Sequence, residues 1–350
     1  MNSMAFEKRE DGKRKLTHVD LEVTRKCNLS CVHCSASFKR RGKEMQVATI
    51  KEILKEAKSI GLENVGLTGG EPFCSKEKLM QIGDFCRNEL DIPIHLHSNG
   101  TKIAKQEAEW IKQLDAEISI PFYGDTAIIH DNITRKRCSF QSSLKGLKSL
   151  INADADVCVY IVPMKQNLQA IRPLIEFVYA EGVRRVRVLS LSPTGRARAQ
   201  FEQSELSVRD TEELNTDLVG IQKKMKMELG TGFCTSQNFK DLDILKGHEA
   251  CFAAENRIHI DVFGNVFPCT ASSGQITFSA GNLQAPENSL SSIWTKSPLL
   301  QFFRNFHKNP PKKCSRCKRH ESCMSGCRVK MWYKYGDVTT ADLSCKRPHN

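Results

Sequence analysis

Short apolar runs alternate with amphipathic stretches along the first two thirds of the chain. Six runs are short, aliphatic or β-branched, and bounded by Gly, Pro, Asn or Asp, as is typical of strands. These predicted strands are 18–24, 64–68, 93–98, 116–122, 157–162 and 186–191. Each is followed by a stretch with helical spacing of apolar residues or, in the last case, a more polar helix. These predicted helices are 48–60, 76–90, 104–114, 140–151, 168–180 and 207–229.

Six strand–helix repeats predict an α/β fold with a parallel sheet and right-handed crossovers. An open, doubly wound sheet and a curved, incomplete barrel fit this order equally well. After about residue 230 helical periodicity weakens, and Gly264-Asn265 separates two apolar runs as a hairpin turn does. We therefore expect a charged tail at 1–16, a core domain at 17–230, and a smaller domain at 231–350.

Composition narrows the class of protein. The chain has 350 residues, 40% of them apolar, which is enough for a substantial core. Its 15 cysteines are an odd number, so they cannot all pair as disulfides. The charged N-terminus has no signal-peptide pattern, and no run of about 18 apolar residues predicts a membrane span. We expect a cytoplasmic protein whose cysteines bind metal or do redox chemistry.

Three cysteines follow the first predicted strand: Cys27, Cys31 and Cys34. Loops after the strands of a parallel α/β domain form its active face, which places these thiols at a catalytic position. A zinc site is one interpretation, but zinc favours four ligands from paired knuckles. Three thiolates on one loop suit a [4Fe–4S] cluster, whose missing fourth ligand leaves one iron open.

The C-x3-C-x2-C spacing resembles the signature of radical S-adenosylmethionine (SAM) enzymes. The resemblance implies a partial (βα)6, TIM-like barrel, which would decide between the two architectures. It also implies that the open iron binds SAM, whose reductive cleavage gives a 5′-deoxyadenosyl radical that abstracts hydrogen from a substrate. Cys27, Cys31 and Cys34 would then be the catalytic and cluster-binding residues.

Further segments resemble the SAM-binding elements of that family. The turn after the second strand would bind the methionine amino group, the end of the third strand the ribose, and the loop after the sixth strand the adenine side. Two more residues, on and beyond the fourth strand, match positions that touch ribose and carboxylate. The implied SAM-binding residues are Gly69, Gly70, Glu71, Pro72, Ser98, Asn99, Ser119, Arg135 and Gly195. One departure is Cys138-Ser139-Phe140, where relatives often have Gly-Ser-Phe.

A second cysteine group closes the chain. Its spacings differ from two matched zinc knuckles, although a zinc module remains an alternative. The seven-cysteine order resembles the SPASM extension of radical SAM enzymes, which implies two auxiliary [4Fe–4S] clusters. By that resemblance the outer cluster is held by Cys314, Cys317, Cys323 and Cys345, and the inner one by Cys251, Cys269 and Cys327. The inner cluster then lacks one ligand. Cys234 or another residue supplies it, or one iron stays open.

The other cysteines fall into two sets. Cys86 and Cys158 lie in a predicted helix and strand, where we expect buried thiols. Cys74 and Cys138 lie in loops that could face the cavity. The basic runs 39–43 and 312–319 are interpreted as solvated surface, because no aromatic platform or helix–turn–helix accompanies them. An excess of 12 positive charges is thus weak support for a nucleic-acid partner.

The resemblance implies a substrate as well as a reaction. Most relatives with this extension mature a ribosomally made peptide by crosslinking or oxidation. The alternative is a small-molecule enzyme, such as a tetrapyrrole side-chain decarboxylase or a sugar dehydrogenase or epimerase. A non-catalytic zinc protein is the distant third. We expect a flavodoxin or ferredoxin as reductant and, since only about 16 residues precede the first strand, a separate leader-peptide-binding protein.

Overall fold

A computed structural model describes residues 14–35, 44–231, 253–317, 320–323 and 325–342, with Arg9, Gly12, Cys251 and Cys345. The strands of these residues form one 10-stranded sheet in the order β10-β9-β8-β1-β2-β3-β4-β5-β6-β7. Neighbouring strands from β8 through β1 to β7 run parallel. The predicted α/β fold is therefore confirmed.

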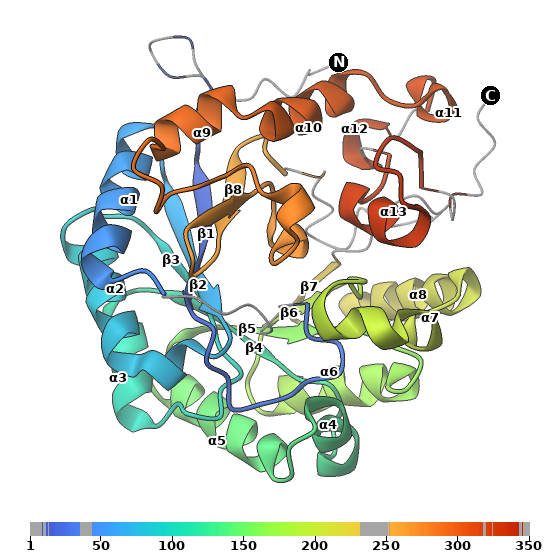
Figure 1. Ribbon diagram of the computed structural model, residues 1–350. Helices are drawn as coiled ribbons and strands as arrows, with labels where there is room; N and C mark the ends of the chain where they lie inside the picture. The colour runs from blue at the N-terminus through green and yellow to red at the C-terminus, as the bar shows by residue number, and fades with distance from the viewer. Residues whose placement is uncertain are drawn as a thin grey trace.

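The first half is the expected strand–helix series, curved into a partial barrel. Its strands are β1 (His18–Thr24), β2 (Asn64–Gly69), β3 (Ile94–His97), β4 (Glu117–Pro121), β5 (Asp156–Ile161), β6 (Arg185–Val188) and β7 (Glu228–Thr231). Its helices are α1 (Val47–Ser59), α2 (Lys76–Asn88), α3 (Lys105–Gln113), α4 (Ala127–Thr134), α5 (Ser139–Asn152), α6 (Ile171–Ala180), α7 (Phe201–Ser204) and α8 (Val208–Lys224). Figure 1 shows α1, α2, α3, α5 and α6 following one another around the outside of the curved sheet.

Alternation along each strand separates two chemically different faces. Val19 and Leu21 of β1, for example, are fully buried and belong to the apolar core that also contains the helix residues. The intervening residues point to the opposite, inner face, because successive side chains of a strand alternate. That inner face is polar and charged, with His18, Asp20, Glu22, His95, His97, Glu117, Ser119, Cys158, Tyr160, Arg185, Arg187, Arg257 and His259.

The C-terminal region extends the same sheet. β8 (Arg257–Ile260) and β9 (Asn265–Phe267) form the predicted hairpin around Gly264, whose φ of 78° suits glycine. β10 (Gly281–Asn282) completes that edge, and β8 pairs with β1 in parallel. The sheet is therefore continuous across the boundary expected near residue 230.

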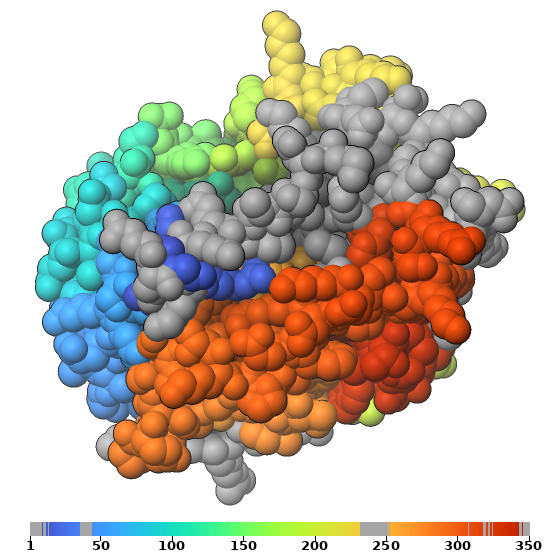
Figure 2. Space-filling model, turned by 90° about the horizontal axis from the view of Figure 1, so that it is seen from above, coloured from blue at the N-terminus to red at the C-terminus, as the bar shows by residue number. Residues whose placement is uncertain are grey.

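In the described part of the chain the α-helices after the hairpin are α9 (Leu290–Lys296), α10 (Pro298–Lys308), α11 (Lys312–Ser315), α12 (His320–Cys323) and α13 (Arg328–Tyr335). Glu56 of α1 accepts hydrogen bonds from the backbone N–H groups of Leu290 (3.0 Å) and Ser291 (2.8 Å). This joins the start of α9 to the barrel. In Figure 2 the orange residues of the C-terminal region accordingly adjoin the light-blue residues of the barrel.

Two elements differ from the sequence-based prediction. The helix predicted to extend to residue 229 ends at Lys224, and the last residues form β7 instead. Helix α4 was not predicted, because its eight residues lie in a loop with turn-forming neighbours. No helix among the described residues is long and apolar enough to cross a membrane.

Candidate active site

The loop that carries Cys27, Cys31 and Cys34 leaves the end of β1 and is fixed by its neighbours. The C-terminal end of α4 accepts two backbone hydrogen bonds from it, Ser30 N to Thr134 O (3.0 Å) and Val32 N to Ile133 O (2.9 Å). These carbonyls have no partner within their own helix because it ends there. The unpredicted helix therefore helps to shape the cysteine loop.

The loop after β6 contacts the cysteine loop from the other side. Arg196 donates its backbone N–H to Cys34 O (2.9 Å) and its side-chain Nε to Cys31 O (3.0 Å). A Cβ on Gly195 would lie 2.5 Å from Cys34 O, so only glycine allows this approach. The structure thus brings the predicted Gly195 against the first cysteine group.

The three thiols are close enough to influence one another electrostatically. Burial, with smaller contributions from neighbouring thiols and Glu71, raises the pKa of Cys27 to about 11, and burial together with Cys34 and Cys27 raises that of Cys31 to about 12. Buried thiols without a metal therefore stay protonated, and a bound cationic centre would convert them to thiolate ligands. Loop position, mutual proximity and donor type fit a [4Fe–4S] cluster.

The Gly69–Gly70 turn packs on the chain just before Cys27. Gly70 N donates to Thr24 O (2.7 Å), and Glu71 N donates to Lys26 O (2.7 Å). A Cβ on Gly70 would lie 2.3 Å from Lys26 O, and one on Gly69 would lie 2.3 Å from Thr24 O. The glycines thus permit close contact between two loops of the protein itself. Pro72 is buried immediately beyond the turn.

Glu71 is a buried hub rather than an exposed carboxylate. Its Oε1 accepts from Phe73 N (3.1 Å) and Ser98 Oγ (2.8 Å), and its Oε2 accepts from Asn99 N (2.7 Å). Burial raises its pKa, although these hydrogen bonds oppose the shift. Glu71 thus fixes the turn after β3 against the turn after β2, which brings Ser98 and Asn99 beside the first cysteine group.

A residue within the cysteine spacing completes this connection. Asn99 donates its side-chain Nδ2 to Asn28 Oδ1 (3.0 Å), and Asn28 donates to Thr101 Oγ1 (2.7 Å). Asn28 and Thr101 are not among the site residues predicted from the sequence. Their only sequence signal is that Asn28 directly follows Cys27 and Thr101 directly follows Ser98-Asn99-Gly100.

Two of the residues predicted to bind SAM, Ser119 and Arg135, lie in different places. Ser119 is 3% exposed on the inner face of β4, and its side chain hydrogen-bonds Tyr160 of β5. Arg135 is exposed and has φ 54°, just after the end of α4 that contacts Ser30. The structure thus puts Arg135 next to the cysteine loop and Ser119 within the barrel.

The thiols outside the two groups also have defined positions. Cys86 and Cys158 are buried, as expected. Cys138 is exposed with φ 65°, a left-handed conformation that glycine adopts more readily than cysteine. Cys74 influences Cys27 electrostatically and so lies beside the first group. Cys234 and the basic run 39–43 lie outside the described residues.

Aromatic and imidazole rings adjoin the first cysteine group. Tyr123, at the end of β4, is 5% exposed, and its ring centroid is 4.4 Å from that of His33. The ring of His130 in α4 lies 5.3 Å from Tyr123. Burial, aided by the nearby Cys31, raises the pKa of Tyr123 well above its usual value. These rings line the side of the cysteine loop that faces α4.

The C-terminal cysteines fall into two neighbourhoods. Burial, with the proximity of Cys269 and Cys327, raises the pKa of Cys251 to about 12. Burial also raises the pKa of Cys323, with contributions from Cys345 and Cys314. These are the inner and outer sets that the resemblance implied, and Cys317 joins the outer set through its N–H bond to Cys314 O (3.0 Å).

Among the described residues, no three or more His, Cys, Asp or Glu side chains converge closely enough to hold a single metal ion. A [4Fe–4S] cluster separates its thiolates more widely than one ion does, because iron and sulfide lie between them. The donor sets around Cys27, Cys251 and Cys323 consist of neighbouring, partly exposed thiols, which fit such clusters.

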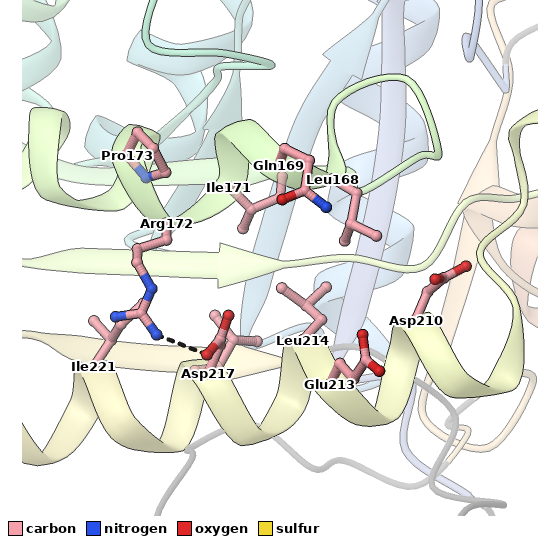
Figure 3. Close-up of a pocket in the computed structure, with 11 residues that line it drawn as sticks. Leu168, Gln169, Ile171, Arg172, Pro173, Asp210, Glu213, Leu214, Asp217 and Ile221 are labelled. Carbon is pink, nitrogen blue, oxygen red and sulfur yellow. Dashed lines mark hydrogen bonds and ion pairs between the residues drawn. The ribbon is translucent and has the colours of Figure 1, made fainter.

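A cavity of about 340 Å³ lies between α6 and α8, and its lining residues include no cysteine. Figure 3 shows its apolar floor, with Ile171 and Leu214, and the ion pair of Arg172 with Asp217 at its rim. None of the predicted site residues lines it.

Comparison with known proteins agrees with this geometry. The chain is 26% identical to an AdoMet-dependent heme synthase of Methanosarcina barkeri, over 93% of this chain and 94% of the relative. It is 24% identical to the mycofactocin maturase MftC of Mycolicibacterium smegmatis, over 93% and 81%. Its fold matches SuiB of Streptococcus suis, solved with its precursor peptide SuiA, with a TM-score of 0.75, 20% identity, and coverage of 95% and 76%.

Two family models match in sequence order. The radical SAM superfamily matches residues 21–178, which include the first cysteine group and the strands β2 to β5. The iron–sulfur cluster-binding domain SPASM matches residues 251–318, which include the hairpin. Both domains bind iron–sulfur clusters, and the first also binds SAM. Residues 21–178 are therefore a radical SAM domain, and residues 251–318 are a SPASM domain.

Proposed function

We propose that this radical SAM enzyme matures a ribosomally made peptide, by crosslinking or oxidising residues within it. The observation that carries the reaction is the three-thiol loop at the end of β1, held beside Ser98 and Asn99 through Glu71. The peptide substrate is supported by the maturase MftC and by SuiB, which was solved with a precursor peptide.

In this proposal Cys27, Cys31 and Cys34 hold the SAM-binding cluster, and the seven C-terminal cysteines hold two auxiliary clusters. When bound, the first cluster and SAM supply the reductive cleavage that produces a 5′-deoxyadenosyl radical. The turns at Gly69–Gly70 and Ser98–Asn99, together with Gly195, would contact SAM when it binds. A flavodoxin or ferredoxin would supply the electron, and a separate protein would present the leader peptide.

The inner face of the barrel would receive the substrate. Its charged and hydrogen-bonding side chains include Arg187, whose NH2 pairs with Glu228 (2.7 Å) and whose buried NH1 has no hydrogen-bond partner among the described residues. Such groups can bind the polar backbone of a peptide.

A small-molecule substrate is the second candidate. The heme synthase relative, which matches over 94% of its own length, favours it. The inner-face arginines Arg185, Arg187 and Arg257 would suit the carboxylates of a tetrapyrrole. A side-chain decarboxylation of such a compound would use the same hydrogen abstraction.

The first experiment tests the clusters. Anaerobic reconstitution should give about twelve irons per chain if three [4Fe–4S] clusters form. Replacing Cys27, Cys31 and Cys34 with Ala should lower this to about eight and abolish 5′-deoxyadenosine formation. Cys138→Gly is the matched control, because it removes an exposed thiol where φ is 65° and should keep all the iron. Binding of zinc without sulfide would refute the proposal.

The second experiment separates the substrates. The reconstituted enzyme is incubated with SAM, a reductant and either a short peptide encoded beside its gene or a carboxylated porphyrin. Loss of hydrogen mass from the peptide supports maturation, whereas release of carbon dioxide from the porphyrin supports the second candidate. Deuterium passing from a labelled substrate into 5′-deoxyadenosine identifies the atom abstracted.

A further inference from the structure

A segment after β6 connects the two cysteine-rich parts of the molecule. We call residues 195–205 the bridge segment; it comprises a 3-10 helix, Gly195–Gln200, and α7. Its first end lies on the cysteine loop through Arg196, which bonds Cys31 O and Cys34 O. Gln200 adds a bond from Nε2 to Val32 O (3.0 Å). The bridge segment therefore forms one wall of the first cysteine site.

The other end of the bridge segment is bound to the C-terminal domain. Glu205 pairs with Lys330 (Nζ to Oε1, 2.7 Å) and also with Lys334 through its other oxygen. The two lysines stand one turn apart on α13, so each carboxylate oxygen has its own ammonium. All three side chains are only 23–24% exposed. Reduced solvation makes this pair stronger than an exposed ion pair.

Stacking reinforces the same contact. The ammonium groups of Lys330 and Lys334 lie 5.9 and 5.3 Å from the ring centroid of Phe201 in the bridge segment. In the opposite direction, the guanidinium of Arg198 lies 5.2 Å from the ring centroid of Tyr333 on α13. Cation–π contacts of this kind favour one relative placement of the two segments.

Helix α13 is in turn attached to the inner cysteine set. Cys327 is its N-cap, and the Cys327 Sγ accepts a hydrogen bond from Lys330 N (3.5 Å). Lys330 thus contacts Cys327 through its backbone and Glu205 through its side chain. A continuous series of contacts leads from Cys31 and Cys34 through the bridge segment to Cys327.

We propose that Glu205 is a positioning residue, which anchors the bridge segment to α13 and thereby holds Gly195 and Arg196 against the SAM-binding cysteine loop. SAM affinity at the first cluster then depends on an ion pair made with the C-terminal domain. This inference rests on the proposed binding of SAM at Cys27, Cys31 and Cys34. Glu205 itself touches neither SAM nor a cluster.

The test measures SAM binding to the anaerobically reconstituted holoenzyme by calorimetry. Glu205→Gln should weaken SAM binding about tenfold, within the usual range for coupled sites, while iron content stays unchanged. The control is Glu202→Gln, an exposed residue of the same short helix whose side chain makes no hydrogen bond among the described residues. A purely structural role would lower the melting temperature without changing the Kd for SAM.

A second set of variants approaches the contact from the other domain. Lys330→Gln with Lys334→Gln should weaken SAM binding to the same extent, and combining them with Glu205→Gln should add nothing further. These lysine variants also keep the test informative if Glu205→Gln fails to load iron. The exchange of charges in Glu205→Lys with Lys334→Glu should restore part of the affinity.

Three results would overturn the inference. They are an unchanged SAM Kd in the Glu205 and lysine variants, a loss in the combined variant that equals the sum of the separate losses, and an equal loss in Glu202→Gln. A wild-type holoenzyme that contains iron but binds no SAM would instead refute the proposed function. The two failures are therefore distinguishable.

Discussion

The two cysteine-rich regions are built in opposite ways. The first cysteine loop is hydrogen-bonded to several distant elements, including the end of α4, the turns after β2 and β3, and the bridge segment. In the part of the C-terminal region that the structure describes, the outer cysteines lie in turns closed by local bonds. Examples are Cys317 N to Cys314 O (3.0 Å) and Gly326 N to Cys323 O (3.0 Å).

The helices that carry the outer cysteines are also very short. α11 and α12 have four residues each, fewer than an isolated helix needs for stability in water. From this difference we expect the barrel to shape its cysteine loop before any cluster binds, and the outer C-terminal turns to depend on a cluster for their shape. Metal binding and folding are coupled in such small modules.

The largest expected effect follows from removing the clusters. An iron chelator with a reductant should leave β1 to β6 protected in hydrogen exchange, because those strands are buried on the apolar face. Residues 312–342 should lose protection by at least about a hundredfold, since local opening there would no longer break metal bonds. Hydrogen-exchange mass spectrometry of holo and apo protein measures both regions in one sample.

Loss of protection in the barrel to the same degree as in residues 312–342 would contradict this contrast between the two regions. A further test uses the triple Ala variant of Cys27, Cys31 and Cys34, which lacks only the first cluster. That variant should exchange like the holoenzyme in both regions. The variant Cys323→Ala should expose the outer turns alone.

The strands were predictable because their pattern is local. β1 begins and ends where the alternation of 18–24 begins and ends, and β2 to β6 differ from their predicted ranges by a few residues at each end. The helix predicted at 207–229 was too long because Met225 to Leu229 keeps an apolar spacing that also suits a strand. Strand β7 forms there because β6 offers a parallel partner at the sheet edge.

The candidate site was predictable only in part. Cysteine spacing marks both groups, and turn position marks Gly69 and Gly195. The role of Glu71 as a hub depends on Ser98 and Asn99, which are 27 and 28 residues away and adjoin it only because β2 and β3 are neighbours. The same is true of the sheet, since β8 joins β1 across more than 200 residues of sequence. Single-sequence patterns contain no such pairing information.

The next largest effect is expected at the contact between β8 of the C-terminal region and β1 of the barrel. His259 of β8 and Glu22 of β1 form a buried pair, with Nε2 3.1 Å from Oε1. Burial is the largest single influence and opposes both charges, but the hydrogen bond between the two groups and the attraction of neighbouring charges together outweigh it. The pKa of His259 is therefore raised above 6.5 and that of Glu22 is lowered below 4.5. Replacing His259 with Gln should cost about 3 kcal/mol in the free energy of unfolding, because it leaves the buried Glu22 carboxylate without its opposite charge.

The pH dependence of this loss has a defined sign. The contribution of His259 is fully present below its unfolded pKa and is lost as pH rises through its raised folded pKa. The contribution of Glu22 is present above its unfolded pKa and is lost as pH falls. The stability difference between wild type and His259→Gln should therefore be largest between about pH 5 and 6.5.

His95→Gln is the control: its imidazole is 41% exposed beside Glu117, so its removal should cost less than about 1 kcal/mol. Equal losses of stability in the two variants at every pH would contradict a stabilising role of the His259–Glu22 pair between β8 and β1.

The smallest expected change in stability comes from a variant that alters only the surroundings of the first cysteine loop. In Gly70→Ala the new Cβ would lie 2.3 Å from Lys26 O and 2.7 Å from Arg25 O, and these backbone atoms cannot move without shifting Cys27. The cost should be about 1–3 kcal/mol, as for other overpacked positions. Because the first loop is shaped by the protein, this variant should lose about four irons and the auxiliary clusters should remain.

Gly220→Ala is the matched control, since nothing among the described residues lies within 4 Å of its Cβ in α8. The better helix former should stabilise the protein by up to about 1 kcal/mol. Iron analysis with thermal unfolding measures both variants. If Gly70→Ala kept all its iron, the first loop would be as adaptable as the C-terminal turns, and the contrast between the two regions would disappear.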